Sequence, residues 1–279
     1  MKIKAHIGPG TTALITGGSS GIGLAIARIL VKQGCHVYLA ARRKELLEAS
    51  VFELAPLKRT PDQCVEGIQT DVADWAQVQA LAGKLSAAGV VPDLIINSAG
   101  VVQPGYVQEL DIEHFRWMMD INYHGTVHVI KAFLPAMMQR KSGYIINIAS
   151  GGGLIGIFGY TGYCGSKFAV RGFSDALRYE MERYQIGVAV VYPPDTETPQ
   201  LEYDIQHKPA ETKALTETAG RKTAEDVAQH ILKAASQGKQ VILPGFEAWL
   251  VYFLSTNFGG KMVEWISQMI LRRANRGSG

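Results

Sequence analysis

The chain of 279 residues has little cysteine and no strong excess of either charge. Its three cysteines (Cys35, Cys64 and Cys164) are scattered and lack metal-ligand spacing, which argues against a disulfide framework and a zinc site and is typical of a reducing compartment. The net charge of +3 is small and evenly spread, so the composition argues against a nucleic-acid partner.

Long apolar segments with the features of targeting or membrane-spanning sequences are also lacking. The first ten residues contain no apolar run of signal-peptide length, so no secretory signal is visible. The uncharged stretch Ala248–Gly260 is shorter than the roughly twenty residues that a spanning helix needs. We therefore expect a cytoplasmic protein, with a peripheral position on the cytosolic face of a membrane (the endoplasmic reticulum in a eukaryote) left open.

What is present is an alternation of short apolar runs and segments of helical periodicity, without an internal repeat. This alternation predicts an α/β protein with a doubly wound (Rossmann) parallel sheet, helices on both faces and a single domain. The expected strands are Thr12–Thr16, His36–Ala41, Val65–Asp71, Leu94–Asn97, Gly143–Ser150 and Gly187–Tyr192. The expected division is a cofactor-binding and catalytic domain over 1–245 and an apolar, amphipathic extension over 246–279. Within the domain, the polar stretch 199–221 has little periodicity and predicts a long loop that serves as a substrate lid.

A glycine-rich turn, Gly17–Gly23, follows the first expected strand and precedes an apolar periodicity that ends at Gly34. Glycines allow the backbone to approach a diphosphate, and the N–H groups at the start of the next helix point toward the anion. This order of strand, turn and helix predicts a dinucleotide site.

The second expected strand is followed by Arg42 and Arg43. A site for a free ribose 2′-hydroxyl usually has Asp or Glu at this point, whereas a 2′-phosphate is matched by arginine. The sequence therefore favours NADP over NAD. The alternative is that both arginines belong to a solvated helix face of mixed charge.

Polar residues also end two later strands and interrupt a long helical pattern. Asp71 and Asn97 are expected at the carboxyl edge of the sheet, where ligands bind in such folds. Asn122 lies inside a helical stretch predicted from Asp111 to Arg140, and it is either a packing accident or an interruption of the backbone hydrogen-bond ladder.

Tyr163 and Lys167 are four residues apart on a helix expected over Thr161–Tyr184, so they project from one face. An ammonium beside a phenol favours the ionised phenol and would bring its pKa of about 10 down toward neutrality. Such a tyrosine could exchange a proton with a carbonyl or alcohol oxygen. The pattern alone is also compatible with a packed Tyr beside a snorkelling Lys.

Together these motifs resemble the short-chain dehydrogenase/reductase family. The resemblance rests on Thr16–Gly23 (T-G-G-S-S-G-I-G), Asp71, Asn97–Gly100 (N-S-A-G), Asn122, Ser150 and Tyr163–Lys167 (Y-C-G-S-K), in the family's order and spacing. Ser98 departs from a second Asn that is frequent in the family, and Pro194 from a frequent Gly. Neither departure removes a reacting group.

The resemblance implies catalytic and cofactor-binding roles. Tyr163 would be the proton donor, Ser150 would hydrogen-bond the carbonyl oxygen, Lys167 would lower the Tyr163 pKa and bind the nicotinamide ribose, and Asn122 would hold a proton-relay water. The cofactor-binding residues it implies are Gly17, Ser19, Ser20, Gly21, Ile22, Gly23, Arg42, Asp71, Val72, Asn97, Ala99, Gly100, Tyr163, Lys167, Pro193, Thr196 and Thr198. No metal is expected.

A narrower resemblance lies in Tyr192–Pro199 (Y-P-P-D-T-E-T-P) and in the context Gly156–Phe173. Both are similar to the group within the family that reduces 3-ketodihydrosphingosine with NADPH. This similarity implies a long-chain sphingoid ketone as substrate, a place in sphingolipid biosynthesis and a homo-oligomer. The alternatives are a reductase of another bulky ketone, such as a steroid or a 3-oxoacyl thioester, and a dinucleotide-binding regulator without activity.

The carboxyl-terminal segment 246–273 combines aromatic residues with cations. Met262, Trp265, Ile266 and Met269 recur at helical spacing, with basic residues at both ends of the segment 261–273. Such a helix can lie in a membrane interface, cover the substrate pocket or form a subunit contact. We predict that residues 246–258 belong to the domain and that residues 262–273 reach a membrane.

Overall fold

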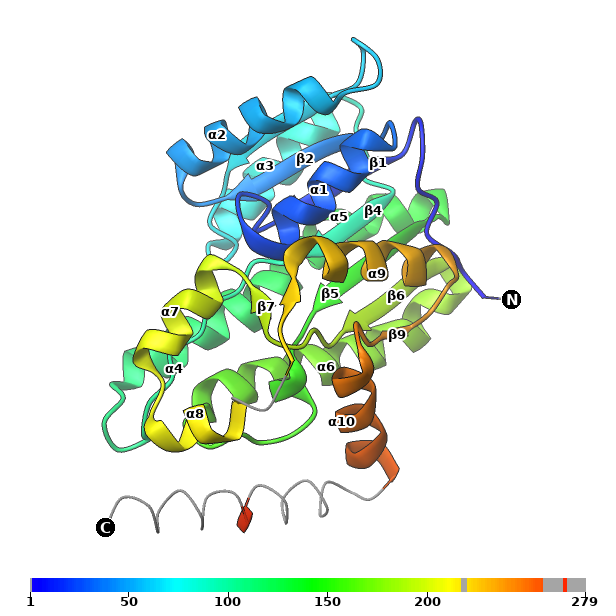
Figure 1. Cartoon of the computed structure of the whole chain (residues 1–279). Coiled ribbons are helices and arrows are strands. Elements are labelled where there is room, and N and C mark those ends of the chain that lie inside the picture. The colour runs from blue at the N-terminus through cyan, green and yellow to red at the C-terminus, as the bar shows by residue number, and fades with distance from the viewer. Residues whose placement is uncertain (1, 217–219, 258–267, 270–279) are drawn as a thin grey trace.

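A computed structural model describes residues 2–216, 220–257 and 268–269 and shows one sheet covered by helices on both faces (Figure 1). The seven strands are parallel and follow the order β3-β2-β1-β4-β5-β6-β9. Their bounds are β1 Thr12–Thr16, β2 His36–Ala41, β3 Val65–Gln69, β4 Leu94–Asn97, β5 Gly143–Ile148, β6 Ile186–Val191 and β9 Val241–Ile242. This arrangement confirms the predicted single-domain doubly wound fold.

Two apolar layers hold the helices against the sheet, because side chains along a strand alternate between its faces. In β1, Ala13 and Ile15 join the layer under α1, α2 and α9, while Leu14 joins the layer under α3, α5 and α6. The strands are almost wholly apolar, as expected for a sheet buried on both faces. The helices are α1 Gly21–Lys32, α2 Lys44–Leu54, α3 Trp75–Ala87, α4 Ile112–Met119, α5 Gly125–Arg140, α6 Thr161–Met181 and α9 Ala224–Ser236.

Local sequence signals set several helix ends. Asp74 caps α3 by accepting hydrogen bonds from the backbone N–H groups of Ala76 and Gln77, and Thr223 caps α9 through Asp226 N–H. Gly34 follows α1 with a φ of 89°, which a residue with a side chain adopts only at a cost.

The segment predicted to be one helix from Asp111 to Arg140 is divided. A π-helical turn, Asp120–His124, separates α4 from α5 and contains the buried Asn122. Of the two interpretations of Asn122, the structure therefore supports an interruption of the ladder, and the expectation of one continuous helix was wrong. The short strand β9 and the pair β7 (Thr196–Glu197) with β8 (Lys222–Thr223) were not predicted either.

The stretch predicted to be a long irregular loop at 199–221 is mostly helical. It contains α7 (Pro199–His207) and α8 (Ala210–Thr216), which lie beside α4 and the start of α6 (Figure 1). Pro199 in the first turn and the Thr198 cap, which accepts from Leu201 N–H at 3.3 Å, start α7. The polar composition of 199–221 suits helices with one exposed face. The lack of an apolar period was therefore not evidence for a loop, and the prediction of a loop was wrong.

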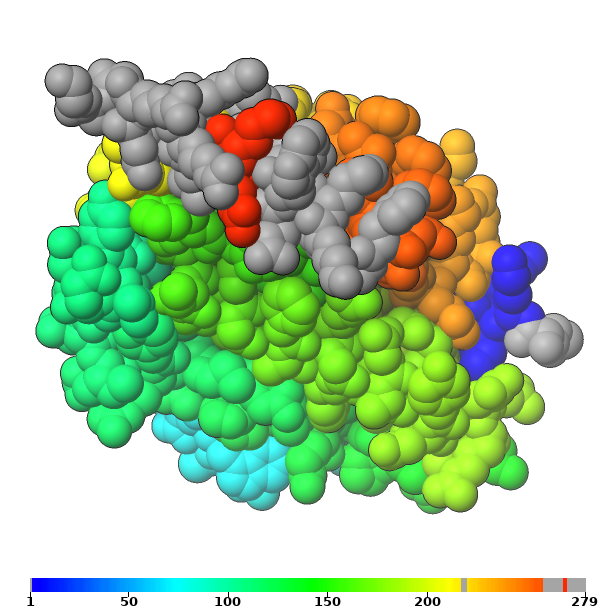
Figure 2. Space-filling view, turned by 90° about the horizontal axis from the view of Figure 1, so that it is seen from below, coloured from blue at the N-terminus to red at the C-terminus, as the bar shows by residue number. Residues whose placement is uncertain are grey.

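Helix α10 (Phe246–Asn257) packs on the domain through one side. Val251 and Tyr252 contact the apolar cluster around Leu154 and Tyr192, and the Tyr192 and Tyr252 rings lie 6.1 Å apart. The other side exposes Phe246, Trp249, Leu250 and Phe253. Figure 2 shows α10, in orange, at the surface beside the green body of the domain. Trp265 and the rest of the predicted interfacial helix, apart from residues 268–269, lie outside the described residues.

No helix among the described residues is both long and apolar enough to cross a membrane.

Candidate active site

The glycine turn between β1 and α1 brings the backbone close to its neighbours. Gly17 and Gly21 have φ values of 65° and 52°. A Cβ at Gly17 would lie 2.8 Å from the backbone of Ala99, and one at Gly23 would lie 2.5 Å from the carbonyl oxygen of Gly17. Side chains larger than hydrogen are therefore excluded on steric grounds.

The amino-terminal end of α1 has the features of an anion site. Ser20 precedes the helix in an extended conformation, and its side chain makes no capping hydrogen bond. Ser19, Ser20, Gly21 and Ile22 all line one cavity, so the first N–H groups of the helix lie at its wall. Unpaired N–H groups at the positive end of a helix dipole fit the diphosphate of a dinucleotide.

Arg42 and Arg43 follow β2 and line the same cavity. Both side chains are exposed, and neither forms an ion pair with a residue in the described ranges, whereas the next residue, Lys44, pairs with Glu48 at 3.8 Å. Their position fits a phosphate on the adenosine ribose. Their role in choosing NADP stays a prediction.

The predicted residues at the carboxyl edge of β3 and β4 divide into two groups. Val72, Ala99 and Gly100 line the cavity. Asp71 instead accepts from Ala73 N–H, and the buried Asn97 donates to Asn147 on β5 at 2.8 Å. Neither of the latter two is among the residues that line the cavity, so direct contact with a cofactor stays a prediction for them.

Three residues from distant parts of the chain meet at the other end of the cavity. Ser150 follows β5, and its hydroxyl accepts from Gly152 N–H at 3.2 Å. Tyr163 lies in the first turn of α6, and Lys167 lies one turn later with its Nζ 5.7 Å from the centre of the Tyr163 ring. Lys167 is buried and donates to the carbonyl oxygen of Ile148 at 3.0 Å. All three line the cavity.

Burial dominates the titration of this pair in the chain without cofactor. It raises the pKa of Tyr163, and a hydrogen bond with Ser150 only partly offsets this effect. Burial also lowers the pKa of Lys167 to about 8. The lowered phenol pKa expected from the sequence is therefore not found in the chain alone, because loss of water on burial favours the neutral phenol. Tyr163 is protonated at neutral pH, which is the form that a proton donor needs.

Asn122 connects the segments that surround Tyr163 and Lys167 through side-chain hydrogen bonds. Its side-chain amide donates to Val101 O and to the Ser166 hydroxyl, both at 2.9 Å, and its side-chain oxygen accepts from Val101 N–H at 2.8 Å. These bonds tie the π-helical turn to the loop after β4 and to α6 beside Lys167. The predicted relay water stays a prediction.

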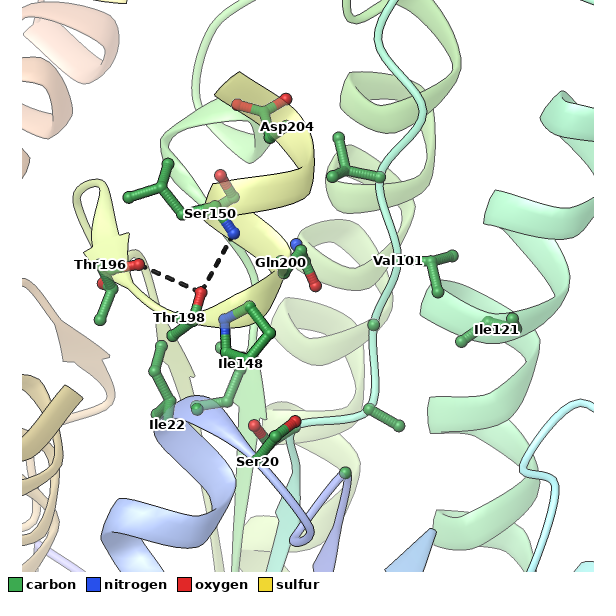
Figure 3. A pocket seen from close by; sticks show the side chains of 18 of the residues that line it. Ser20, Ile22, Val101, Ile121, Ile148, Ser150, Thr196, Thr198, Gln200 and Asp204 are labelled. Carbon is green, nitrogen blue, oxygen red and sulfur yellow. Dashed lines mark hydrogen bonds between the residues drawn. The ribbon is translucent and has the colours of Figure 1, made fainter. Parts of the chain in front are cut away.

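The turn after β6 supplies the last predicted residues. Pro193, Thr196 and Thr198 line the cavity, and Thr196 and Thr198 are held by local hydrogen bonds, which Figure 3 draws for Thr198. Their hydroxyls therefore stabilise the turn that starts α7.

Two acidic residues of the cavity wall were missed in the sequence. Asp195 lies in the turn after β6, and Asp204 lies on α7, where both of its oxygens are within 2.8 Å of the Tyr160 hydroxyl. Lys208 pairs with Asp204 at 3.3 Å. Asp195 was visible in the motif Tyr192–Pro199, but Asp204 could not be found because its segment was expected to be a loop.

The glycine turn, the arginines and the Ser150, Tyr163 and Lys167 group share one cavity of about 470 Å³. In Figure 3, Ser20 and Ile22 lie at the lower end of the view and Asp204 at the upper end. This arrangement can hold an extended dinucleotide with its reactive end beside a phenol and an ammonium.

A family model described as short chain dehydrogenase matches residues 11–209, and the chain belongs to this family. As a member it uses a nicotinamide dinucleotide, NAD or NADP. The chain is 40% identical to a 3-dehydrosphinganine reductase of Danio rerio, over 82% of this chain and 69% of the relative. It is 38% identical to a 3-ketodihydrosphingosine reductase of Bos taurus, over 82% and 70%. A solved actinorhodin polyketide ketoreductase with NADPH is 32% identical, with a TM-score of 0.75 over 82% of this chain and 92% of that one.

Proposed function

We propose that this chain reduces the ketone of 3-ketodihydrosphingosine to the alcohol dihydrosphingosine, with NADPH as reductant. The observation that carries the proposal is the single cavity that joins the glycine turn to Ser150, Tyr163 and Lys167. The similarity to two reductases named for this substrate, over 82% of the chain in both cases, supports the choice of ketone.

The bound dihydronicotinamide would supply a hydride to the carbonyl carbon. Negative charge then develops on the carbonyl oxygen, where the Ser150 hydroxyl donates a hydrogen bond and the Tyr163 hydroxyl donates its proton. Lys167 stabilises the phenolate that remains on Tyr163, and a proton from solvent restores the phenol. One hydride and one proton together convert the ketone to the alcohol.

NADPH rather than NADH is proposed from Arg42 and Arg43. Two exposed guanidinium groups at the cavity wall provide charge and hydrogen-bond donors for a 2′-phosphate. The two positions directly after β2, where a carboxylate would bind a free ribose hydroxyl, are both arginine. The similar polyketide ketoreductase also holds NADPH.

The test is oxidation of NADPH and NADH, followed by absorbance, with three ketones presented in detergent: 3-ketodihydrosphingosine, a steroid ketone and a 3-oxoacyl thioester. We expect the highest kcat/KM for the sphingoid ketone with NADPH. A higher value for either other ketone would assign a different bulky substrate. No oxidation with any ketone, at measurable NADPH affinity, would instead indicate a dinucleotide-binding regulator.

Membrane contact through residues 246–273 and a homo-oligomeric state remain proposals of the same kind. The exposed side chains of Phe246 and Trp249 on α10 support the first. Sedimentation of the protein alone and with anionic vesicles tests both.

A further inference from the structure

The guanidinium groups and the carboxylates of the cavity wall come from different segments of the chain. Among the described residues that line it, the basic ones are Arg42, Arg43 and Lys167, and the acidic ones are Asp195 and Asp204. The arginines follow β2, whereas both carboxylates lie on the segment that follows β6. The end of the cavity that receives the ketone holds Asp204 near Tyr163 together with the Lys167 ammonium, and we call it the acidic end because both carboxylates of the wall belong to the segment that reaches it.

Asp204 lies near the reacting phenol, because it accepts from Tyr160, whose ring centre is 5.8 Å from that of Tyr163, and Asp195 lines the same cavity. Both act on Tyr163 strongly enough to raise its pKa, although less than burial does. The Asp204 carboxylate already has partners in the protein, because it accepts a hydrogen bond from Tyr160 and forms an ion pair with Lys208. The Lys208 ammonium is therefore shared between the two carboxylates: it pairs with Asp204 and acts on Asp195 only from beyond ion-pairing distance, as the exposed Arg221 does.

Asp195 is the carboxylate that is available for a ligand. It is half-buried, and its side chain accepts no hydrogen bond from a residue in the described part of the chain. No basic side chain in the described ranges forms an ion pair with Asp195, and burial raises the pKa of Asp195 although Lys208 and Arg221 act in the opposite direction. A cation bound in the cavity would supply that partner.

We propose that Asp195, with Asp204 behind it, binds the ammonium group on the carbon next to the ketone of the substrate. This inference rests on the proposed function and defines the substrate class as 2-amino-3-ketones. In 3-ketodihydrosphingosine the amine is attached to the neighbour of the carbonyl carbon, so its partner must lie beside the group that protonates the carbonyl oxygen. Asp195 lines the cavity that also holds Tyr163 and Ser150.

The same carboxylates select against other bulky ketones. A steroid ketone carries no cation and would leave Asp195 unpaired in a partly desolvated site. A 3-oxoacyl thioester on an anionic carrier would place like charges together. The alkyl chain of the sphingoid ketone needs only apolar wall, which Val102, Ile157 and Leu201 supply.

The experiment compares wild type with Asp195→Asn on two ketones of equal chain length in the same detergent. One is 3-ketodihydrosphingosine, and the other is the same 1-hydroxy-3-ketone with hydrogen in place of the amine. The control variant is Glu197→Gln, because Glu197 is an exposed carboxylate two residues away that does not line the cavity. Thermal midpoints and NADPH affinities show whether each variant is folded and binds cofactor.

We expect wild type to prefer the amino ketone about ten- to a hundredfold in kcat/KM, the scale of one hydrogen bond between charged groups. Asp195→Asn should remove most of this preference, while Glu197→Gln should keep it. Asp195→Glu, which retains the charge, should restore part of it.

An unchanged ratio between the two ketones in a folded Asp195→Asn variant would overturn the inference and leave the proposed function standing. Equal reduction of both ketones by wild type would do the same. If wild type reduces neither ketone but is active on a steroid ketone or an oxoacyl thioester, the proposed function fails and the inference fails with it.

Discussion

The two ends of the cavity differ in how their residues are assembled. The glycine and arginine end comes from one continuous stretch, β1 to α2, in which only α1 and β2 separate Gly17 from Arg42. The acidic end combines Asp195 and Asp204 with Tyr160 and Tyr163 from another part of the chain. The end proposed to bind the dinucleotide is therefore formed largely by neighbouring sequence, whereas the end proposed to recognise the substrate depends on how α7 packs against the start of α6.

The difference also appears in the electrostatics. At the first end, the exposed guanidinium groups of Arg42 and Arg43 and the first N–H groups of α1 can bind an anion. At the second end, burial moves the pKa values of Tyr163 and Lys167 away from their usual values and in opposite directions. Variants can be used to separate these contributions.

The largest effect is expected for Tyr163→Phe. The ring and its packing remain, but the proton donor is lost, so kcat should fall by about two to four orders of magnitude with little change in NADPH affinity. Tyr179→Phe, on the exposed face of the same helix, is the control and should have wild-type turnover. Turnover near wild type in Tyr163→Phe would refute the assignment of the donor.

A smaller effect is expected at the cofactor end. Arg42→Ala should weaken NADPH binding by about 1.5–3 kcal/mol, the scale of a hydrogen bond to a charged group, and leave NADH binding nearly unchanged. Lys44→Ala removes a neighbouring cation that lies outside the cavity wall and should change neither affinity. Titration calorimetry with both nucleotides measures this, and equal losses for NADPH and NADH would transfer the proposed role to Arg43.

Lys167 gives a prediction about pH and stability in the protein without nucleotide. Its folded pKa of about 8 lies below the unfolded value of 10.5, so between these values the unfolded chain holds more protons. The contribution of Lys167 to the free energy of unfolding should therefore rise with pH, by about 2 kcal/mol between pH 8 and 10.

Lys167→Met removes this titration. The difference between wild type and variant in urea denaturation should move in favour of wild type as the pH rises from 8 to 10. A difference that is constant over this range would show that the ammonium is not desolvated in the folded chain. The variant should also turn over more slowly and bind NADPH less tightly.

The smallest effect on stability is expected at the carboxyl-terminal end. A chain ending at Gly260 retains α10, whose Tyr252 packs against the domain, and should melt within a few degrees of the full chain. It should lose binding to anionic vesicles that the full chain shows at low salt. Aggregation of the shortened chain, or no vesicle binding by the full chain, would contradict the predicted division of this segment.

Most of the fold could be predicted because its signals are local. Apolar runs such as Leu94–Asn97 mark buried strands, and the periodicity after Gly21 marks α1. Errors arose where tertiary contacts override local pattern. β9 has only two residues and is defined by pairing with β6, and α7 is held by contacts of Asp204 and Tyr203 with Tyr160 and Gln103. The π-helical turn at Asn122 depends on hydrogen bonds to Val101 and Ser166, which are distant in sequence.

The sequence by itself determined the family, the doubly wound sheet and the residues around which catalysis is proposed, because glycine turns, strand ends and the Tyr163 to Lys167 spacing are short-range features. Only the tertiary structure decided that these residues share one cavity, that burial raises the Tyr163 pKa, and that Asp195 and Asp204 line the same cavity as the phenol. The physical reason is that desolvation and long-range electrostatics depend on which segments pack together, and residue identities along the chain do not specify that packing locally.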